Sequence, residues 1–129
     1  MVKIPNDLKF TRDHEWVRVE GNVAVVGITD YAQSELSDIV TVELPEVGRR
    51  VKQGEAIGTI EAVKAVADLY AVVSGEVIEV NKEVMKTPDV VNKDPYGQGW
   101  MVKIQISDLS ELRDALSPED YEKLIGEKE

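Results

Sequence analysis

The 129-residue chain contains no cysteine, and it has a single histidine, His14. Without cysteine the chain cannot form disulfides, zinc–thiolate sites or a thiol nucleophile. One histidine cannot build a histidine-rich metal site, and the sequence HEWVR that begins at His14 lacks the second histidine of a zinc-protease helix. We therefore predict no metal site, and any redox chemistry has to come from a group that is added to the chain.

Long hydrophobic runs are also missing, and positive charge is scarce. No apolar stretch approaches the ~20 residues that span a bilayer, and the N-terminal MVKIPNDLKF lacks the apolar core of a signal peptide. We therefore expect a soluble, cytoplasmic protein. The chain has 15 Lys and Arg residues against 25 Asp and Glu, which gives a formal net charge of −10. This charge repels nucleic acid and anionic membranes, so basic protein surfaces are the expected partners.

Ordinary catalytic motifs are absent from the sequence. It has no Gly-rich phosphate loop of the Walker type, and the stretch from Gly97 to Gly99 follows Pro95 and is typical of a turn. Ser74 lacks the preceding glycine that a nucleophile elbow requires. On its own side chains the chain is predicted not to be an enzyme.

The sequence does contain a series of short strand patterns between turn signals, which is typical of antiparallel sandwiches and barrels. The predicted strands are EWVRVEG, NVAVVGIT, DIVTVELP, EAIGTIE, VADLYA, GEVIEVN and MVKIQI. Alternation predicts that Val40, Val42 and Leu44 share one face of their strand. The Gly21-Asn22 pair predicts a tight hairpin between the first two strands.

Helices are predicted only as connectors and as a tail. Thr29 is a predicted N-cap for a short helix over 30–36, and Ser117 followed by Pro118 is typical of a second helix start. We expect one domain over residues 1–129, with a helical tail at about 107–129. The predicted fold is mostly β: a flattened, barrel-like sandwich of antiparallel strands with short connecting helices and a C-terminal helix.

Lys64 stands in the most apolar segment of the chain, between Val63 and Ala65. The two flanking strand patterns leave only four residues between them, so a hairpin places Lys64 at or beside an exposed turn. Such a lysine is either an ordinary surface charge or a tether, whose amine is acylated by a cofactor. The two interpretations differ in what surrounds the lysine.

The chain resembles the H protein of the glycine cleavage system, a lipoyl carrier, over nearly its whole length. The resemblance rests on the segments HEWVRVEG, VGITDYAQ, DIVTVELPEVG, IEAVKA, VSGEVIEVN and NKDPYGQGWM. Gly48 and Gly75 stand where lipoyl domains have glycines before and after the modified lysine. Biotin carriers have a similar hairpin, but their lysine is usually flanked by methionines. Here the residues that flank Lys64 are Val63 and Ala65. The resemblance implies a lipoyl/biotinyl-like sandwich.

By this resemblance Lys64 carries lipoate, and the chain serves glycine catabolism and one-carbon metabolism. The implied partners are glycine decarboxylase (P protein), which loads an aminomethyl group, aminomethyltransferase (T protein) and dihydrolipoyl dehydrogenase (L protein). Glu61 matches the position that guides lipoate ligase or octanoyltransferase, and Glu15 and Asp68 match acids of a cleft that shelters the loaded arm.

The hairpin also departs from the usual family pattern. Ala62 stands where Ser or Thr is common, Ala67 where Ser is frequent, and Ala71-Val72 where Ser-Pro is usual. These changes make the hairpin more apolar. An alternative function is a relay of octanoyl or lipoyl groups to other proteins, since it needs the same hairpin and lysine.

Overall fold

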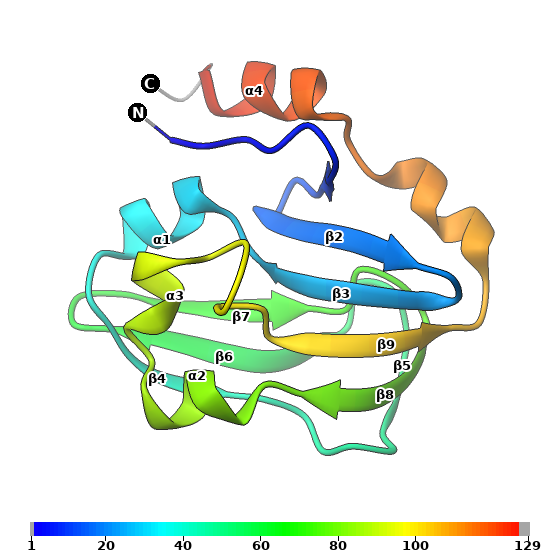
Figure 1. The fold of residues 1–129 in the computed structure, drawn as a ribbon, viewed down its shortest axis with the longest axis horizontal. Helices are drawn as coiled ribbons and strands as arrows, with labels where there is room; N and C mark the ends of the chain where they lie inside the picture. The colour runs from blue at the N-terminus through cyan, green and yellow to red at the C-terminus, as the bar shows by residue number, and fades with distance from the viewer. Residues whose placement is uncertain (1, 127–129) are drawn as a thin grey trace.

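The chain folds into two antiparallel sheets, which a computed structural model describes for residues 2–126. The larger sheet has six strands in the order β1-β2-β3-β9-β8-β5, and the smaller has the order β4-β6-β7 (Figure 1). The strands are β1 (Lys9–Phe10), β2 (Glu15–Glu20), β3 (Val23–Ile28), β4 (Ile39–Glu43), β5 (Arg50–Val51), β6 (Ala56–Ala62), β7 (Val66–Tyr70), β8 (Gly75–Val80) and β9 (Val102–Ile106). The predicted β sandwich and all seven predicted strands are confirmed.

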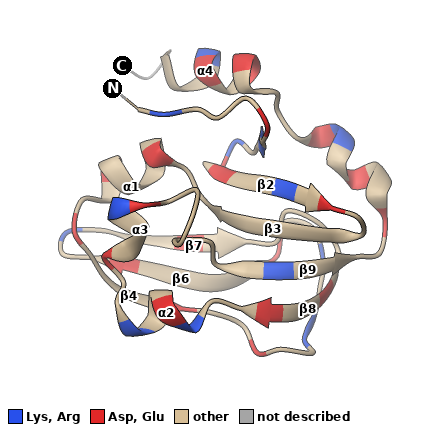
Figure 2. Ribbon diagram, in the orientation of Figure 1, with Lys and Arg blue, Asp and Glu red and all other residues tan. Residues whose placement is uncertain are grey.

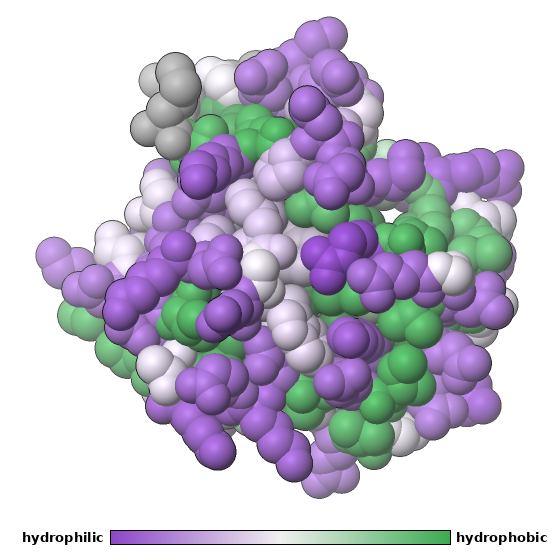
Figure 3. All heavy atoms as spheres, viewed as in Figure 1, coloured by the Kyte–Doolittle hydropathy of each residue, from purple (hydrophilic) through white to green (hydrophobic). Residues whose placement is uncertain are grey.

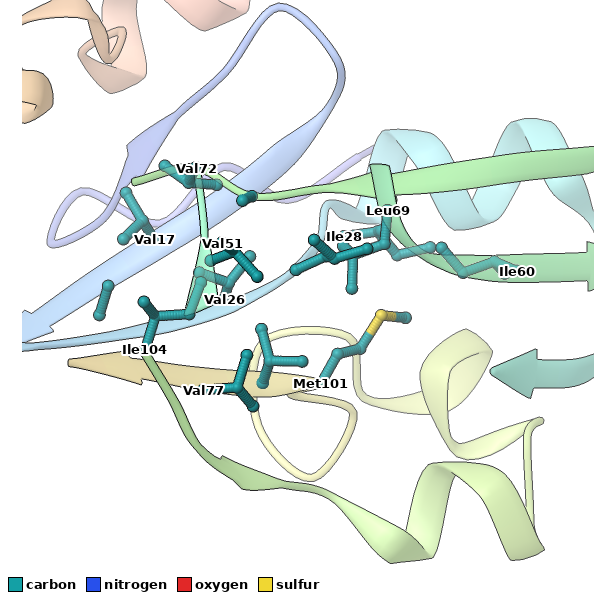
Figure 4. Close-up of a cluster of buried hydrophobic side chains, with 14 of the residues drawn as sticks. Val17, Val26, Ile28, Val51, Ile60, Leu69, Val72, Val77, Met101 and Ile104 are labelled. Atoms are coloured by element: carbon teal, nitrogen blue, oxygen red, sulfur yellow. The ribbon is translucent and has the colours of Figure 1, made fainter. Parts of the chain in front are cut away.

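The core lies between the two sheets. Ile60 and Leu69, from the smaller sheet, point toward Ile28 and Met101 on the side of the larger one (Figure 4). All four side chains are buried, as are Val26, Val77 and Ile104. Hydrophilic residues cover most of the face seen in Figure 3. The burial of the apolar side chains between the two sheets is the main force that holds the sheets together.

One predicted strand face is wrong. Val40 is exposed at 50%, whereas Val42 and Ile39 are buried. The pairing of β4 with β6 contains a bulge between Ile39 and Thr41. A bulge adds a residue to one strand and so breaks the alternation that would have turned Val40 inward.

Both predicted helix starts are confirmed. The Thr29 side chain accepts a hydrogen bond from the Ala32 N–H at the start of α1 (Asp30–Leu36). The Ser117 hydroxyl accepts one from the Asp120 N–H at the start of α4 (Pro118–Gly126). The short helices α2 (Lys82–Lys86) and α3 (Val90–Lys93) were not predicted from the sequence, whereas the 3-10 helix η1 (Leu109–Asp114) falls within the predicted helical tail. Residues 127–129 of the predicted tail lie outside the described residues.

The C-terminal helix packs on the outer side of the larger sheet, next to the N-terminal segment (Figure 1). The Tyr121 ring stacks on Phe10 with centroids 4.7 Å apart. The Tyr121 hydroxyl lies 2.7 Å from Thr29 Oγ1 and 2.9 Å from His14 Nδ1. These contacts fix α4 against the start of β2. No helix within residues 2–126 is long and apolar enough to cross a membrane.

Gly48 and Gly75, the two glycines that frame the lysine in sequence, both meet a structural requirement. Gly48 has φ +97°, a left-handed conformation that favours glycine. At Gly75 a Cβ would lie 1.9 Å from the Gln105 carbonyl oxygen, so a side chain cannot be accommodated without moving backbone. Both positions therefore set the path of the chain around β5 and β8.

Ser37, the residue after α1, has φ 63° and ψ −139°, a conformation that L residues rarely adopt. Glycine adopts it without strain, so Ser37→Gly is expected to raise the free energy of unfolding by about 1 kcal/mol. Urea denaturation followed by circular dichroism measures the change. Ser34→Gly, an exposed position inside α1, is the matched control and should lower stability by about 0.5 to 1 kcal/mol. Equal effects of the two substitutions would contradict strain at Ser37.

Candidate cofactor attachment site

Lys64 lies in the turn of the β6–β7 hairpin, at one end of the sandwich (Figure 1). Glu61 on β6 pairs with Val66 on β7, and the Ala62 N–H donates to the Ala65 carbonyl over 2.7 Å, which closes the turn. The Lys64 side chain is exposed. Val63 beside it is 67% exposed, so the amine has no bulky neighbour that buries it. An acylating enzyme can therefore reach the amine.

Glu61 lies on the outer face of the smaller sheet. It is the second-to-last residue of β6, which ends at Ala62 just before the turn. It is exposed and pairs across the sheet with Thr41 on β4. An enzyme that approaches Lys64 from this face meets the Glu61 carboxylate.

Glu15, at the start of β2, is almost completely buried, with 2% of its surface exposed. Its carboxylate accepts hydrogen bonds from the Tyr70 N–H (2.7 Å) and from the Thr11 hydroxyl (3.1 Å). The pKa of Glu15 is raised to about 8, chiefly by burial and to a smaller extent by the charge of Asp13, although both hydrogen bonds favour the charged form. A carboxyl group that titrates near neutral pH is typical of a functional site.

Asp68 lies on β7, exposed, two residues before Tyr70. The negative charge of Asp68 is the main cause that raises the pKa of the Tyr70 hydroxyl, followed by burial and by the charges of Asp13 and Glu15. The structure therefore brings the two predicted cleft acids to the same tyrosine. Glu15 accepts a hydrogen bond from the Tyr70 N–H, and the charge of Asp68 raises the pKa of the Tyr70 hydroxyl. Tyr70 was not among the site residues predicted from the sequence.

Two hollows lie beside these residues. One, of about 310 Å³, is lined by Glu15, Thr11, Arg12, Asp13 and Tyr70 among others. The other, of about 460 Å³, is lined by Ala32 and Leu36 of α1, by Tyr31, His14 and Glu35, and by Ala67 of β7. Asp13 lines both. Ala67 is three residues from Lys64, so the second hollow lies within reach of a group attached to the turn.

A larger hollow lies at the opposite end of the hairpin. It has a volume of about 920 Å³ and is lined by Arg50, Lys52, Ser74 and Glu111, among other residues. These residues flank the start of β6 and the end of β7, a whole strand length away from the turn. It adjoins the 310 Å³ hollow, with which it shares Gln53 and Glu111, but neither Glu15 nor Tyr70 lines it.

The two-sheet sandwich, with an exposed lysine at a hairpin turn, defines the class of lipoyl-domain-like carriers. The sequence matches the family model for the glycine cleavage H-protein over residues 8–128. It is 56% identical over 128 residues to the glycine cleavage system H protein of Carboxydothermus hydrogenoformans, covering 99% of this chain and 98% of that protein. It is 57% identical over 129 residues to that of Rubrobacter xylanophilus, covering 100% of both.

A solved structure supports the same assignment. The crystal structure of a glycine cleavage system H protein from Mycobacterium marinum superposes with a TM-score of 0.88 and 38% sequence identity. The match covers 95% of this chain and 99% of that one. The chain therefore belongs to the glycine cleavage H-protein family, the lipoyl carriers of the glycine cleavage system. It is a non-catalytic component, and the family works with the P, T and L proteins.

Proposed function

We propose that lipoate is attached to Lys64 by an amide bond between its Nζ and the lipoyl carboxyl group. The observation that carries this proposal is the exposure of Lys64 in a hairpin turn that is otherwise lined by small and apolar residues. Acylation removes the lysine charge. The lysine stem and lipoyl chain span about a dozen bonds of ~1.5 Å, so the dithiolane could extend on the order of 14 Å from the backbone.

The attached group would supply a disulfide, one sulfur of which would carry the aminomethyl group from the P protein to the T protein, leaving a dithiol for the L protein to reoxidise. When no partner protein is bound, the attached group rests against residues of the chain itself. The hollow lined by Ala32, Leu36 and Ala67 offers apolar surface beside the turn. A chain without cysteine also offers no thiol that would compete in disulfide exchange.

Glu15 and Asp68 are proposed to shelter the loaded arm. A protonated amine is a cation, and its arrival favours the charged form of Glu15, whose pKa is about 8 without it. A carboxylate then binds the amine through a charge-assisted hydrogen bond. Glu15 lines one hollow and Asp68 follows Ala67, which lines the other. Exclusion of water from such a place slows hydrolysis of the cargo.

Glu61 is proposed to guide the enzyme that installs the group, a lipoate ligase or an octanoyltransferase. Its carboxylate is exposed on β6, the strand that leads into the turn. Acidic residues also occur on α1, α4 and β8 (Figure 2), which suits partners with basic surfaces. The cytoplasmic location and the single carrier domain over residues 1–129 stay predictions.

Incubation of the unmodified chain with a lipoate ligase, ATP and lipoate is expected to add one lipoyl group. Peptide mass spectrometry should localise it to Lys64, because this amine stands in the hairpin turn beside Glu61. Lys52 and Lys82 are internal controls, since both are exposed but lie outside the turn. Modification at either of these residues in place of Lys64 would contradict the proposal.

A further inference from the structure

Asn92 of α3 forms three hydrogen bonds to a segment of the chain more than fifty residues earlier. Its amide Nδ2 donates to Gln33 Oε1 over 2.9 Å and to the Ser37 carbonyl over 2.7 Å. Its Oδ1 accepts from the Ile39 N–H over 3.1 Å. The Asn92 side chain therefore binds both ends of the connection between α1 and β4: Gln33 and Ser37 on the α1 side, and Ile39 at the start of β4. The proposed attachment of lipoate to Lys64 gives no role to Asn92 or to the motif NKDPYGQGW that contains it.

The connection held by Asn92 is strained. Ser37 has the rare combination of φ 63° and ψ −139°, and its N–H donates to the Gln33 carbonyl over 2.9 Å. Residues in such conformations persist only where the surroundings fix them. Asn92 binds the carbonyl of Ser37 and the N–H of Ile39, so it fixes the two peptide groups that flank Asp38.

Asp38 contacts the turn that carries Lys64. Its carbonyl accepts a hydrogen bond from the Val63 N–H over 3.1 Å. Val63 immediately precedes Lys64, and its side chain is 67% exposed, like that of Val66 at 63%. The exposed side chains of Val63 and Val66 add little packing. The Ala62–Ala65 hydrogen bond closes the turn internally, and the Val63–Asp38 hydrogen bond ties the turn to the connection between α1 and β4.

We infer that Asn92 is a positioning residue for the lysine turn. Through Ser37 and Asp38 it fixes the Val63 amide, and with it the direction in which the Lys64 side chain leaves the hairpin. In Figure 1, α1 and α3 lie at the end of the sandwich where the hairpin turn projects, as this connection requires. The functional part of the inference rests on the proposed attachment of lipoate to Lys64.

The first test measures hydrogen exchange of the Val63 amide by NMR in the unmodified full-length chain. Asn92→Ala is expected to speed this exchange about tenfold, because the hydrogen bond to Asp38 is no longer held in place. Asn81→Ala is the matched control. Asn81 is half-buried like Asn92, and it also forms three hydrogen bonds, to Gln98 and Trp100 carbonyls and to the Glu83 N–H. None of these partners belongs to the lysine turn or to residues 37–39, so Val63 exchange should stay at the wild-type rate.

Two further variants keep the inference falsifiable if Asn92→Ala folds poorly. Asn92→Asp keeps the acceptor for Ile39 and loses both donors, so it should also speed Val63 exchange. Adding Ser37→Gly to Asn92→Ala should restore part of the protection, because glycine adopts the strained conformation without help from Asn92. Unchanged Val63 exchange in both Asn92 variants, or equal acceleration in Asn81→Ala, would overturn the inference.

The second test compares lipoylation kinetics with a lipoate ligase. Asn92→Ala is expected to lower kcat/KM by roughly fivefold, because the lysine is less well oriented for acylation, whereas Asn81→Ala should stay close to wild type. Equal kcat/KM for both variants would overturn a role in positioning Lys64. Failure of the wild-type chain to accept lipoate at Lys64 would instead refute the proposed function, and the exchange measurement would still decide whether Asn92 holds the turn.

Discussion

Lys64→Arg is expected to abolish lipoylation and all carriage of aminomethyl groups, while the melting temperature stays that of the wild type. Arginine keeps the positive charge and the long stem, but its guanidinium stays protonated and does not act as an acyl acceptor as a lysine amine does. Because the side chain is exposed in a turn, its replacement should change the free energy of unfolding by less than about 0.5 kcal/mol. Mass spectrometry after treatment with lipoate ligase measures the first effect, and a thermal melt measures the second.

The functional readout is glycine–bicarbonate exchange reconstituted with P protein. Lys52→Arg is the control, since Lys52 is exposed and lies at the other end of the hairpin. It should accept lipoate and support exchange at the wild-type rate. Exchange activity that survives in Lys64→Arg would refute Lys64 as the attachment point. A large loss of stability would show instead that Lys64 has a structural role.

The strands were predictable because their patterns are local. Some of the seven predicted strands alternate cleanly, as from Val40 to Leu44 and from Val102 to Ile106, and others such as AVVGI are apolar on both faces. All seven are short apolar-rich runs bounded by turn signals, and the structure contains all of them. The strands β1 and β5 have two residues each, which is too short for a periodic signal. The face of Val40 could not be predicted, because it depends on a bulge in the pairing of β4 with β6.

The site was predictable only in part. The position of Lys64 in a turn follows from the spacing of its two strands. The burial of Glu15 does not, because an acid at the start of a strand is usually exposed, and here the Tyr70 backbone from a distant strand covers it. The role of Asn92 depends on partners 53 to 59 residues away in sequence, and a single sequence carries no signal for such contacts.

Raising the pH from about 5 to about 9 is expected to lower the stability of the wild type by several kcal/mol through Glu15. The pKa of Glu15 is about 8 in the folded chain, against an ordinary value of 4.5. Between these values the folded state keeps a proton that the unfolded state has lost. Stability therefore falls as the pH rises through this range, by up to about 1.4 kcal/mol per pH unit. Below about pH 4.5 and above about pH 8 the contribution of Glu15 should be constant.

Glu15→Gln should remove most of this pH dependence. Glutamine resembles the protonated acid: its carbonyl can accept from the Tyr70 N–H, and its NH₂ can donate to the Thr11 hydroxyl oxygen. Urea denaturation at a series of pH values should show similar stabilities of variant and wild type at pH 5, and a more stable variant at pH 9. Glu61→Gln, which replaces an exposed acid, should follow the wild-type curve. A variant curve parallel to that of the wild type would contradict a raised pKa at Glu15.

The same variant is expected to shorten the lifetime of the aminomethyl-loaded form, because glutamine cannot become negatively charged when the cationic amine arrives. Asp68→Asn removes the second proposed charge from the exposed side of Tyr70 and should act in the same direction. Release of ammonia or formaldehyde from purified loaded protein without T protein measures the lifetime, near pH 7. Both variants should still accept lipoate and be reoxidised by the L protein at near wild-type rates, because neither acid is part of the lysine turn. Equal release rates in the wild type and both variants would discard the sheltering role of Glu15 and Asp68, and the attachment at Lys64 would stand.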